Sequence, residues 1–163
     1  MIAAAQVVFR NQHGGGCLDW LAIELQRAGV SCSPTEWRGY GSLVPQLLVP
    51  TSPVSLTIQV ESDPAYVPQE ISELAEEAKP LLSTDLSSAL ASCDTRLDIM
   101  STTPTKVTET DRAISVFAQT DLDPGTPEVE RVWFLLSTIT NGFIVDCVNG
   151  RLCAPGGRAW TVL

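Results

Sequence analysis

The segment RNQHGGGCLDW, residues 10–20, brings together residue types that are used in covalent catalysis. It holds the only histidine of the chain, His13, and one of the five cysteines, Cys17, on either side of three glycines. A thiol at the start of a helix is stabilised as the thiolate by the helix dipole, and an imidazole is a common base for such a nucleophile. Cys17 and His13 are therefore the candidates for a cysteine-dependent reaction.

The stretch from Gln12 to Trp20 resembles the nucleophile segment of papain-type cysteine proteases, but two further residues separate its cysteine from its tryptophan. Enzymes of that kind use a histidine from a distant part of the chain. Here His13 lies in the same short loop as Cys17, and no residue is evident that would orient the imidazole. We therefore assign no catalytic residue and keep Cys17 and His13 as candidates.

The three glycines could also bind an anion, because a loop between a strand and a helix exposes backbone N–H groups. The pattern lacks the Gly-Lys-Ser/Thr ending of a P-loop and the spaced glycines of a dinucleotide fold. Arg10 is the only nearby cation, and Asp19 opposes an anion. A site for a small anion or nucleotide in the loop at 11–20 remains an alternative. We favour a flexible hinge, since glycine tolerates most backbone angles.

The sequence contains no motif typical of a metal or cofactor site. The single histidine and the scattered cysteines form no pair with metal-ligand spacing, and residues 121–128 lack the full set of calcium-loop ligands. We expect neither a metal nor a cofactor. The odd number of widely spaced cysteines indicates reduced thiols in a cytoplasmic protein, with a Cys147–Cys153 pair left open. Asp146 interrupts an apolar strand, so we expect it to pair with Arg96, Arg151 or Arg158.

The charge of the chain points to proteins as partners. Its 10 Lys and Arg against 19 Asp and Glu give a net charge of -9. Such a field repels nucleic acid and anionic membranes and favours basic partners, and no apolar run is long enough to span a bilayer. The candidate contact residues are the acids of one expected helix, a second acidic cluster and two aromatic anchors: Glu70, Glu73, Glu76, Glu77, Asp121, Asp123, Trp37 and Tyr40.

Hydrophobic periodicity places these residues on alternating strands and helices. The expected strands are residues 4–9, 43–49, 53–60, 96–100, 106–109, 113–118, 143–148, 151–153 and 159–163. The expected helices begin near residues 18, 69, 83 and 127, and residues 31–40 are expected to be irregular. Pro45 favours an edge strand, Pro80 should break the second helix, and Gly29 and Asn141 should end the first and last helices.

The element order predicts a single α+β domain over residues 1–163. We expect a mixed, mostly antiparallel sheet with its helices on one face, because strand–helix–strand–strand–helix–strand is the order of a split βαβ, ferredoxin-like unit. By elimination we expect a non-catalytic cytoplasmic protein that binds a basic protein. Bacterial immunity and antitoxin proteins, which inhibit toxins, share this small, acidic profile. The acidic helix could instead be an ordinary solvated face, and the oligomeric state is not predicted.

Overall fold

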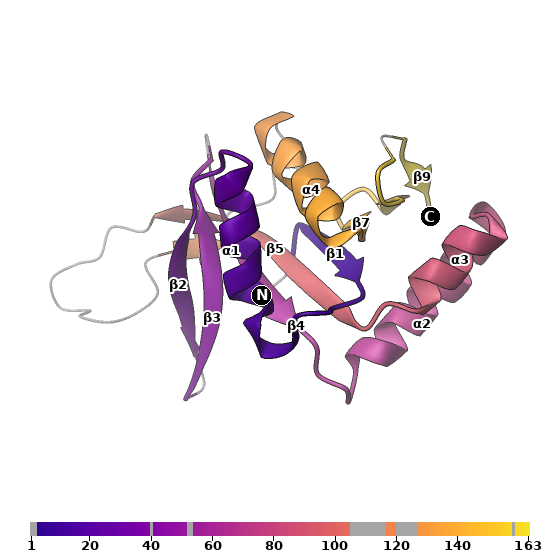
Figure 1. Cartoon of the computed structure of the whole chain (residues 1–163), viewed down its shortest axis with the longest axis horizontal. Helices are drawn as coiled ribbons and strands as arrows, with labels where there is room; N and C mark the ends of the chain where they lie inside the picture. The colour runs from indigo at the N-terminus through magenta and orange to yellow at the C-terminus, as the bar shows by residue number, and fades with distance from the viewer. Residues whose placement is uncertain (1–2, 40, 52–53, 105–116, 120–126, 158) are drawn as a thin grey trace, which may run out of the picture.

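The computed structural model describes residues 3–39, 41–51, 54–104, 117–119, 127–157 and 159–163, and its strands form one antiparallel sheet (Figure 1). The strand order is β2-β3-β4-β5-β1-β7-β8-β9, and β6 pairs with β5 beside this path. The strands are β1 Ala5–Phe9, β2 Ser33–Gly39, β3 Ser42–Val49, β4 Ser55–Glu61, β5 Thr95–Pro104, β6 Phe117–Gln119, β7 Phe143–Asp146, β8 Arg151–Cys153 and β9 Thr161–Val162. The helices are α1 Cys17–Arg27, α2 Val67–Ala78, α3 Thr84–Ala91 and α4 Pro127–Thr140.

The α+β class and the antiparallel sheet are confirmed. Strand β1 lies at the centre, between β5 and β7, and β5 also pairs with β4. In the chain, α1 follows β1 and leads through β2 and β3 to β4, and α4 leads from β6 to β7. This arrangement is compatible with the expected split βαβ unit, in which each helix connects two strands that have a third strand between them.

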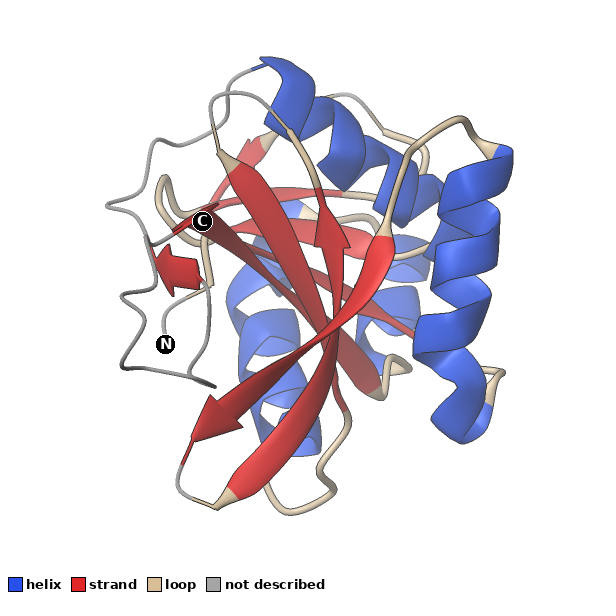
Figure 2. Cartoon of the chain, turned by 90° about the vertical axis from the view of Figure 1, so that its left-hand side faces the viewer, coloured by secondary structure: helices blue, strands red, loops and turns tan. Residues whose placement is uncertain are grey.

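The helices cover both faces of the sheet, so the expectation that they gather on one face is wrong (Figure 2). Helices α1 and α4 pack on the face that carries Val7 and Phe9, whereas α2 and α3 pack on the face that carries Val8. All three of these β1 side chains are at most 2% exposed. A strand that is apolar on both faces needs cover on both, and the unbroken apolar run of β1 carried that signal.

Helix ends follow the sequence signals. Gly29 ends α1 with φ 82°, and Asn141 ends α4 with φ 53°. Between α2 and α3, Pro80 lies in a short 3-10 turn, and the Ser83 hydroxyl caps α3 by accepting a hydrogen bond from the Leu86 N–H. Both outcomes confirm the predictions, because proline cannot continue an α-helix and serine satisfies a free N–H at a helix start.

The strands beside α1 differ from expectation. Residues 33–39 form β2, which pairs along its length with β3, although this stretch was expected to be irregular. Tertiary pairing overrides the weak local propensity of a sequence containing Pro34 and glycine. Pro45 lies in β3, an interior strand, yet the β3–β4 ladder includes only residues 47–49 of β3. The missing N–H of Pro45 therefore falls where β3 pairs with β2 alone, which explains why it is tolerated.

Strands β7 and β8 form a hairpin in which β7 is shorter than the expected strand at 143–148, whereas β8 has the expected bounds. Asn149 and Gly150 lie in the connection between β7 and β8, and Gly150 has φ 60°. Strand β7 ends at Asp146, because that side chain accepts hydrogen bonds from the N–H groups of the next turn. The expected strand at 106–109, most of that at 113–118, and the residues Tyr40, Asp121 and Asp123 lie outside the described residues. None of the described helices is long and apolar enough to cross a bilayer.

Candidate functional site

The glycine segment forms a defined turn. Gly14–Gly16 make one turn of 3-10 helix directly before α1. The Asn11 N–H donates to Asp94 Oδ1 at 2.9 Å, the Asn11 amide donates to the Gly14 carbonyl, and the His13 N–H donates to Asn11 Oδ1 at 2.8 Å. These bonds tie the turn to itself and to the strand-side residue Asp94, so it is more than an open connection between β1 and α1.

The structure separates the two candidate catalytic residues. The Cys17 side chain is 1% exposed and packs in the core beneath α1, whereas His13 is exposed. The His13 ring stacks on Trp20, with 4.0 Å between ring centroids and 15° between their planes. Burial raises the pKa of the Cys17 thiol to about 11, which is opposite to the lowering that the helix dipole was expected to produce. Cys17 is thus placed as a core residue.

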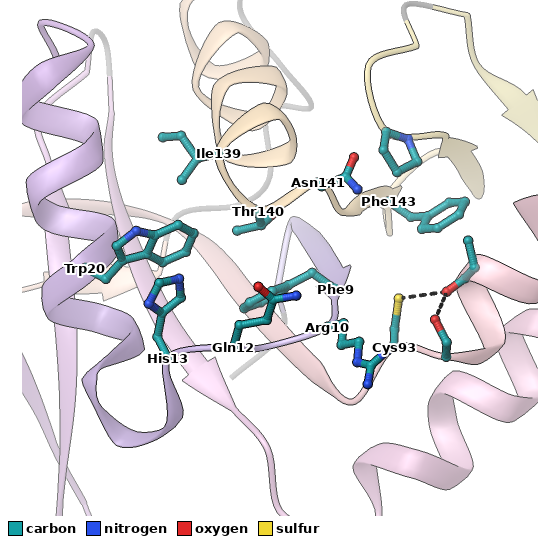
Figure 3. A pocket seen from close by; sticks show the side chains of 13 residues that line it. Phe9, Arg10, Gln12, His13, Trp20, Cys93, Ile139, Thr140, Asn141 and Phe143 are labelled. Carbon is teal, nitrogen blue, oxygen red and sulfur yellow. Dashed lines mark hydrogen bonds between the residues drawn. The ribbon is translucent and has the colours of Figure 1, made fainter.

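His13 instead lines a hollow of about 450 Å³ at one end of the sheet (Figure 3). The end of β1 supplies Phe9 and Arg10, and the following loop supplies Gln12. The opposite walls come from the ends of α3 and α4 and from the start of β7, including Cys93, Asn141 and Phe143. Residues far apart in sequence therefore meet here, and sequence reasoning had only Arg10 and His13 as signals of this pocket.

The other thiols offer no activated nucleophile. Cys93 lines the pocket, but burial and the neighbouring Asp94 raise its pKa to about 12, and its thiol donates to the Ala89 carbonyl at 3.4 Å. Cys147 and Cys153 are both free thiols, the first exposed and the second buried. Over the described residues, no group of three or more His, Cys, Asp or Glu side chains is placed to hold a metal ion.

Asp146 has the structural partner that its position predicted. Its side chain is fully buried and lies 2.7 Å from Arg151 Nε, and Arg151 also reaches Glu130 at 3.0 Å. The guanidinium lies over the Trp160 ring, 4.0 Å from its centroid. Burial alone would raise the pKa of Asp146, but the hydrogen bonds from Asn149 and Arg151 outweigh it and lower the pKa below 3.8.

The acidic residues of α2 divide into two groups. Glu70 forms an ion pair with Arg96, which also contacts Asp98 at 2.7 Å. The remaining three acids, Glu73, Glu76 and Glu77, lie on the exposed side of the helix, opposite its buried stripe.

The three exposed acids of α2 have little internal compensation. Among the described residues, Glu73 accepts a hydrogen bond only from the neutral amide of Gln69, and Glu76 lies 4.0 Å from Lys79. Within the described chain Glu77 has no ion-pair or hydrogen-bond partner. We call these three residues, Glu73, Glu76 and Glu77, the α2 acidic face.

Trp37, the expected aromatic anchor, lies on β2 and is half-buried. It pairs in register with Val44 of β3, and β2 is the outermost strand on its side of the sheet. Helix α2 packs through its buried stripe over the β1, β7 and β8 part of the sheet, and its acidic face points away from the sheet. The two predicted contact elements are therefore not brought together into one patch by the sheet order.

Comparisons with known proteins name no relative for this arrangement: no family model matches the chain, and no curated protein or solved structure matches it.

Proposed function

We propose that this protein is a non-catalytic binding protein whose α2 acidic face docks a basic protein partner. The observation that carries the proposal is the lack of internal compensation for this face. Glu70 is paired with Arg96, whereas Glu73, Glu76 and Glu77 are exposed and, within the described residues, share one cation contact, the 4.0 Å approach of Lys79 to Glu76. Carboxylates in this state retain their field for a partner and speed the encounter with a basic surface.

Two further observations support a binding role. The net charge of -9 extends the negative field beyond the helix. The cysteines with a resolved shift, among them Cys17 and Cys93, have raised pKa values, which disfavours the thiolate that a cysteine-dependent enzyme needs. Within this class, an immunity-type or antitoxin-type inhibitor of a basic protein toxin, acting in the cytoplasm, is the specific role that we propose.

The test reverses the charge of the proposed contact without disturbing the core. The variant E73K/E76K/E77K changes only exposed side chains of α2. A matched control, D19K/E24K/E36K, makes the same change in net charge on α1 and β2, where Glu24 and Glu36 form only surface ion pairs. Wild type, variant and control would each be immobilised and exposed to a lysate of the native host, and proteins retained by wild type would be purified.

The purified partner would then be titrated against all three proteins. We expect the α2 variant to bind about tenfold to a hundredfold more weakly, since each exposed charge pair contributes up to about 1 kcal/mol. The control should bind within about threefold of wild type, and added salt should weaken the wild-type complex. Equal affinity of the α2 variant and wild type, or equal loss in the control, would remove the α2 acidic face as the contact.

A further inference from the structure

The hollow beside the glycine turn differs in charge from the rest of this acidic protein. Its lining contains Arg10 and His13 and no carboxylate. Two other hollows in the described part of the chain each include a glutamate, Glu130 in one and Glu128 in the other. The hollow at the end of β1 is therefore a place where an anion meets no opposing charge in the wall.

Arg10 is free to act on such an anion. In the described part of the chain every other basic residue except Arg131 forms an ion pair with a carboxylate, whereas Arg10 forms none. Asp94 lies nearby in the structure, but its Oδ1 accepts from the Asn11 N–H and the Thr95 hydroxyl. A guanidinium presents a planar set of donors that fits carboxylate and phosphate oxygens.

Three further polar side chains of the lining are unused, whereas those of Ser92, Cys93 and Thr140 bond to backbone carbonyls of α3 and α4. Within the described residues the side chains of Gln12, His13 and Asn141 make no hydrogen bond or ion pair. They come from the loop after β1 and from the end of α4, and Figure 3 shows Gln12 between His13 and Arg10. Convergent polar groups without internal partners, set in a concave site, are typical of a ligand pocket.

The apolar part of the pocket suits a flat molecule. Phe9 and Phe143, each 1% exposed, are apolar residues of the lining, and the His13–Trp20 stack stands on one side of the hollow. Aromatic rings prefer offset stacking on one another, so the stack offers a surface for a further ring. The volume of about 450 Å³ lies in the range for small-molecule sites.

We propose that this hollow is a binding site for a small planar molecule that carries a carboxylate or phosphate group. Arg10 supplies the positive charge for the oxyanion, Gln12 and Asn141 offer amide donors in the same lining, and the ring lies against the His13–Trp20 stack. The overall negative charge of the protein does not prevent this, because charges beyond about 8 Å are largely screened at physiological salt. The site is independent of the α2 acidic face.

Titrations monitored by backbone amide NMR of the labelled full chain test the proposal at about 0.15 M salt. The probes are benzoate and phenyl phosphate, with benzamide as the neutral ring and inorganic phosphate as the anion without a ring. We expect saturable shifts for Gln12, His13 and Asn141 with at least one ring-bearing anion, and weaker binding by about tenfold for benzamide and inorganic phosphate. Relative response to benzoate and phenyl phosphate distinguishes the carboxylate from the phosphate.

Variants assign the binding to the pocket. Arg10→Ala removes an exposed side chain and should weaken binding of the ring-bearing anion about tenfold, while Arg10→Lys, which keeps the charge, should lose less. Arg131→Ala removes the other arginine that has no ion pair among the described residues, and it should leave affinity unchanged. The proposal is overturned by absence of saturable shifts at the pocket, by benzamide binding as tightly as the anions, or by equal loss in the Arg10→Ala and Arg131→Ala variants.

Discussion

The buried carboxylate of Asp146 should be among the most costly charges to remove from this protein, and Asp146→Asn is the least disruptive way to remove it. The side chain is fully buried and accepts four hydrogen bonds. Oδ1 accepts the N–H groups of Val148 and Asn149, at 3.1 and 3.2 Å. Oδ2 accepts the Asn149 amide at 2.9 Å and Arg151 Nε at 2.7 Å.

The magnitude follows from which bonds an asparagine keeps. Its carbonyl oxygen can replace Oδ1, but its NH₂ group would face two donors, from Asn149 and Arg151. Losing one neutral hydrogen bond, at about 1 kcal/mol, and one charge-assisted bond, at about 2 kcal/mol, predicts a loss of about 3 kcal/mol in the free energy of unfolding. In the variant, Arg151 still has its ion pair with Glu130 and its contact with the Trp160 ring. The expected loss of stability therefore lies at the lower end of the range for a broken buried ion pair.

The loss should also depend on pH. The pKa of Asp146 is lowered in the folded chain, so its contribution is complete well above the ordinary value of 3.8. It declines as the pH falls below 3.8 towards the folded-state pKa, because the protonated carboxyl resembles the asparagine amide in charge. The difference between wild type and Asp146→Asn is therefore expected to be largest at pH 7 and smaller at pH 3.

Urea unfolding at the two pH values measures both effects, with Glu77→Gln as a control that neutralises an exposed acid. At pH 7 we expect about 3 kcal/mol for Asp146→Asn, or a fall in Tm of about 6–12 °C for a chain of this size, and less than about 0.5 kcal/mol for the control. A loss below 1 kcal/mol at pH 7, or the same loss at pH 3 and pH 7, would refute the account of Asp146 as a buried, ionised hub.

Other substitutions test single features of the fold. Native Cys17 should resist alkylation from pH 7 to 9 and react after unfolding in urea, since its pKa is raised to about 11; rapid native labelling would contradict its burial. Ser83→Ala should lower stability by about 1 kcal/mol through loss of the α3 cap, whereas Ser88→Ala, exposed within α3, should not. Gly142→Ala should lower the free energy of unfolding by more than about 2 kcal/mol, because a Cβ at this position lies 2.8–2.9 Å from three neighbouring atoms. Gly16→Ala, which places its Cβ in open space, should change it by less than about 1 kcal/mol. Thermal unfolding compares the variants of each pair.

The parts of the fold that were predictable are those with local causes. One or two residues and a short-range rule predict the helix ends at Gly29 and Asn141 and the break at Pro80. The same holds for the pairing of Asp146 with an arginine. Strand β2 was missed because its stability comes from pairing with β3, which is not visible in its own sequence.

The two-sided cover of the sheet could have been foreseen from β1. Its consecutive apolar residues contradicted a sheet with one wet face, and Val8 points to the side opposite Val7 and Phe9. The error came from placing all four expected helices on the single face that the helices of a split βαβ unit cover. Helices α2 and α3 follow β4 and precede β5 in the chain, and they cover the second face of the sheet.

The same topology explains why the glycine segment looked like an active site and is placed as a pocket wall. Helix α1 leaves β1 so that the first turn directs Cys17 into the core, where burial raises the pKa of its thiol. The residues before that turn remain at the end of the sheet, where α3 and α4 also end. Although His13 and Cys17 are four residues apart in sequence, His13 is exposed and Cys17 is buried. His13 and Asn141 are far apart in sequence, yet they line one hollow. The buried Cys17 thiol is therefore not available to His13, and the proposed ligand of the hollow is the group that His13 would contact.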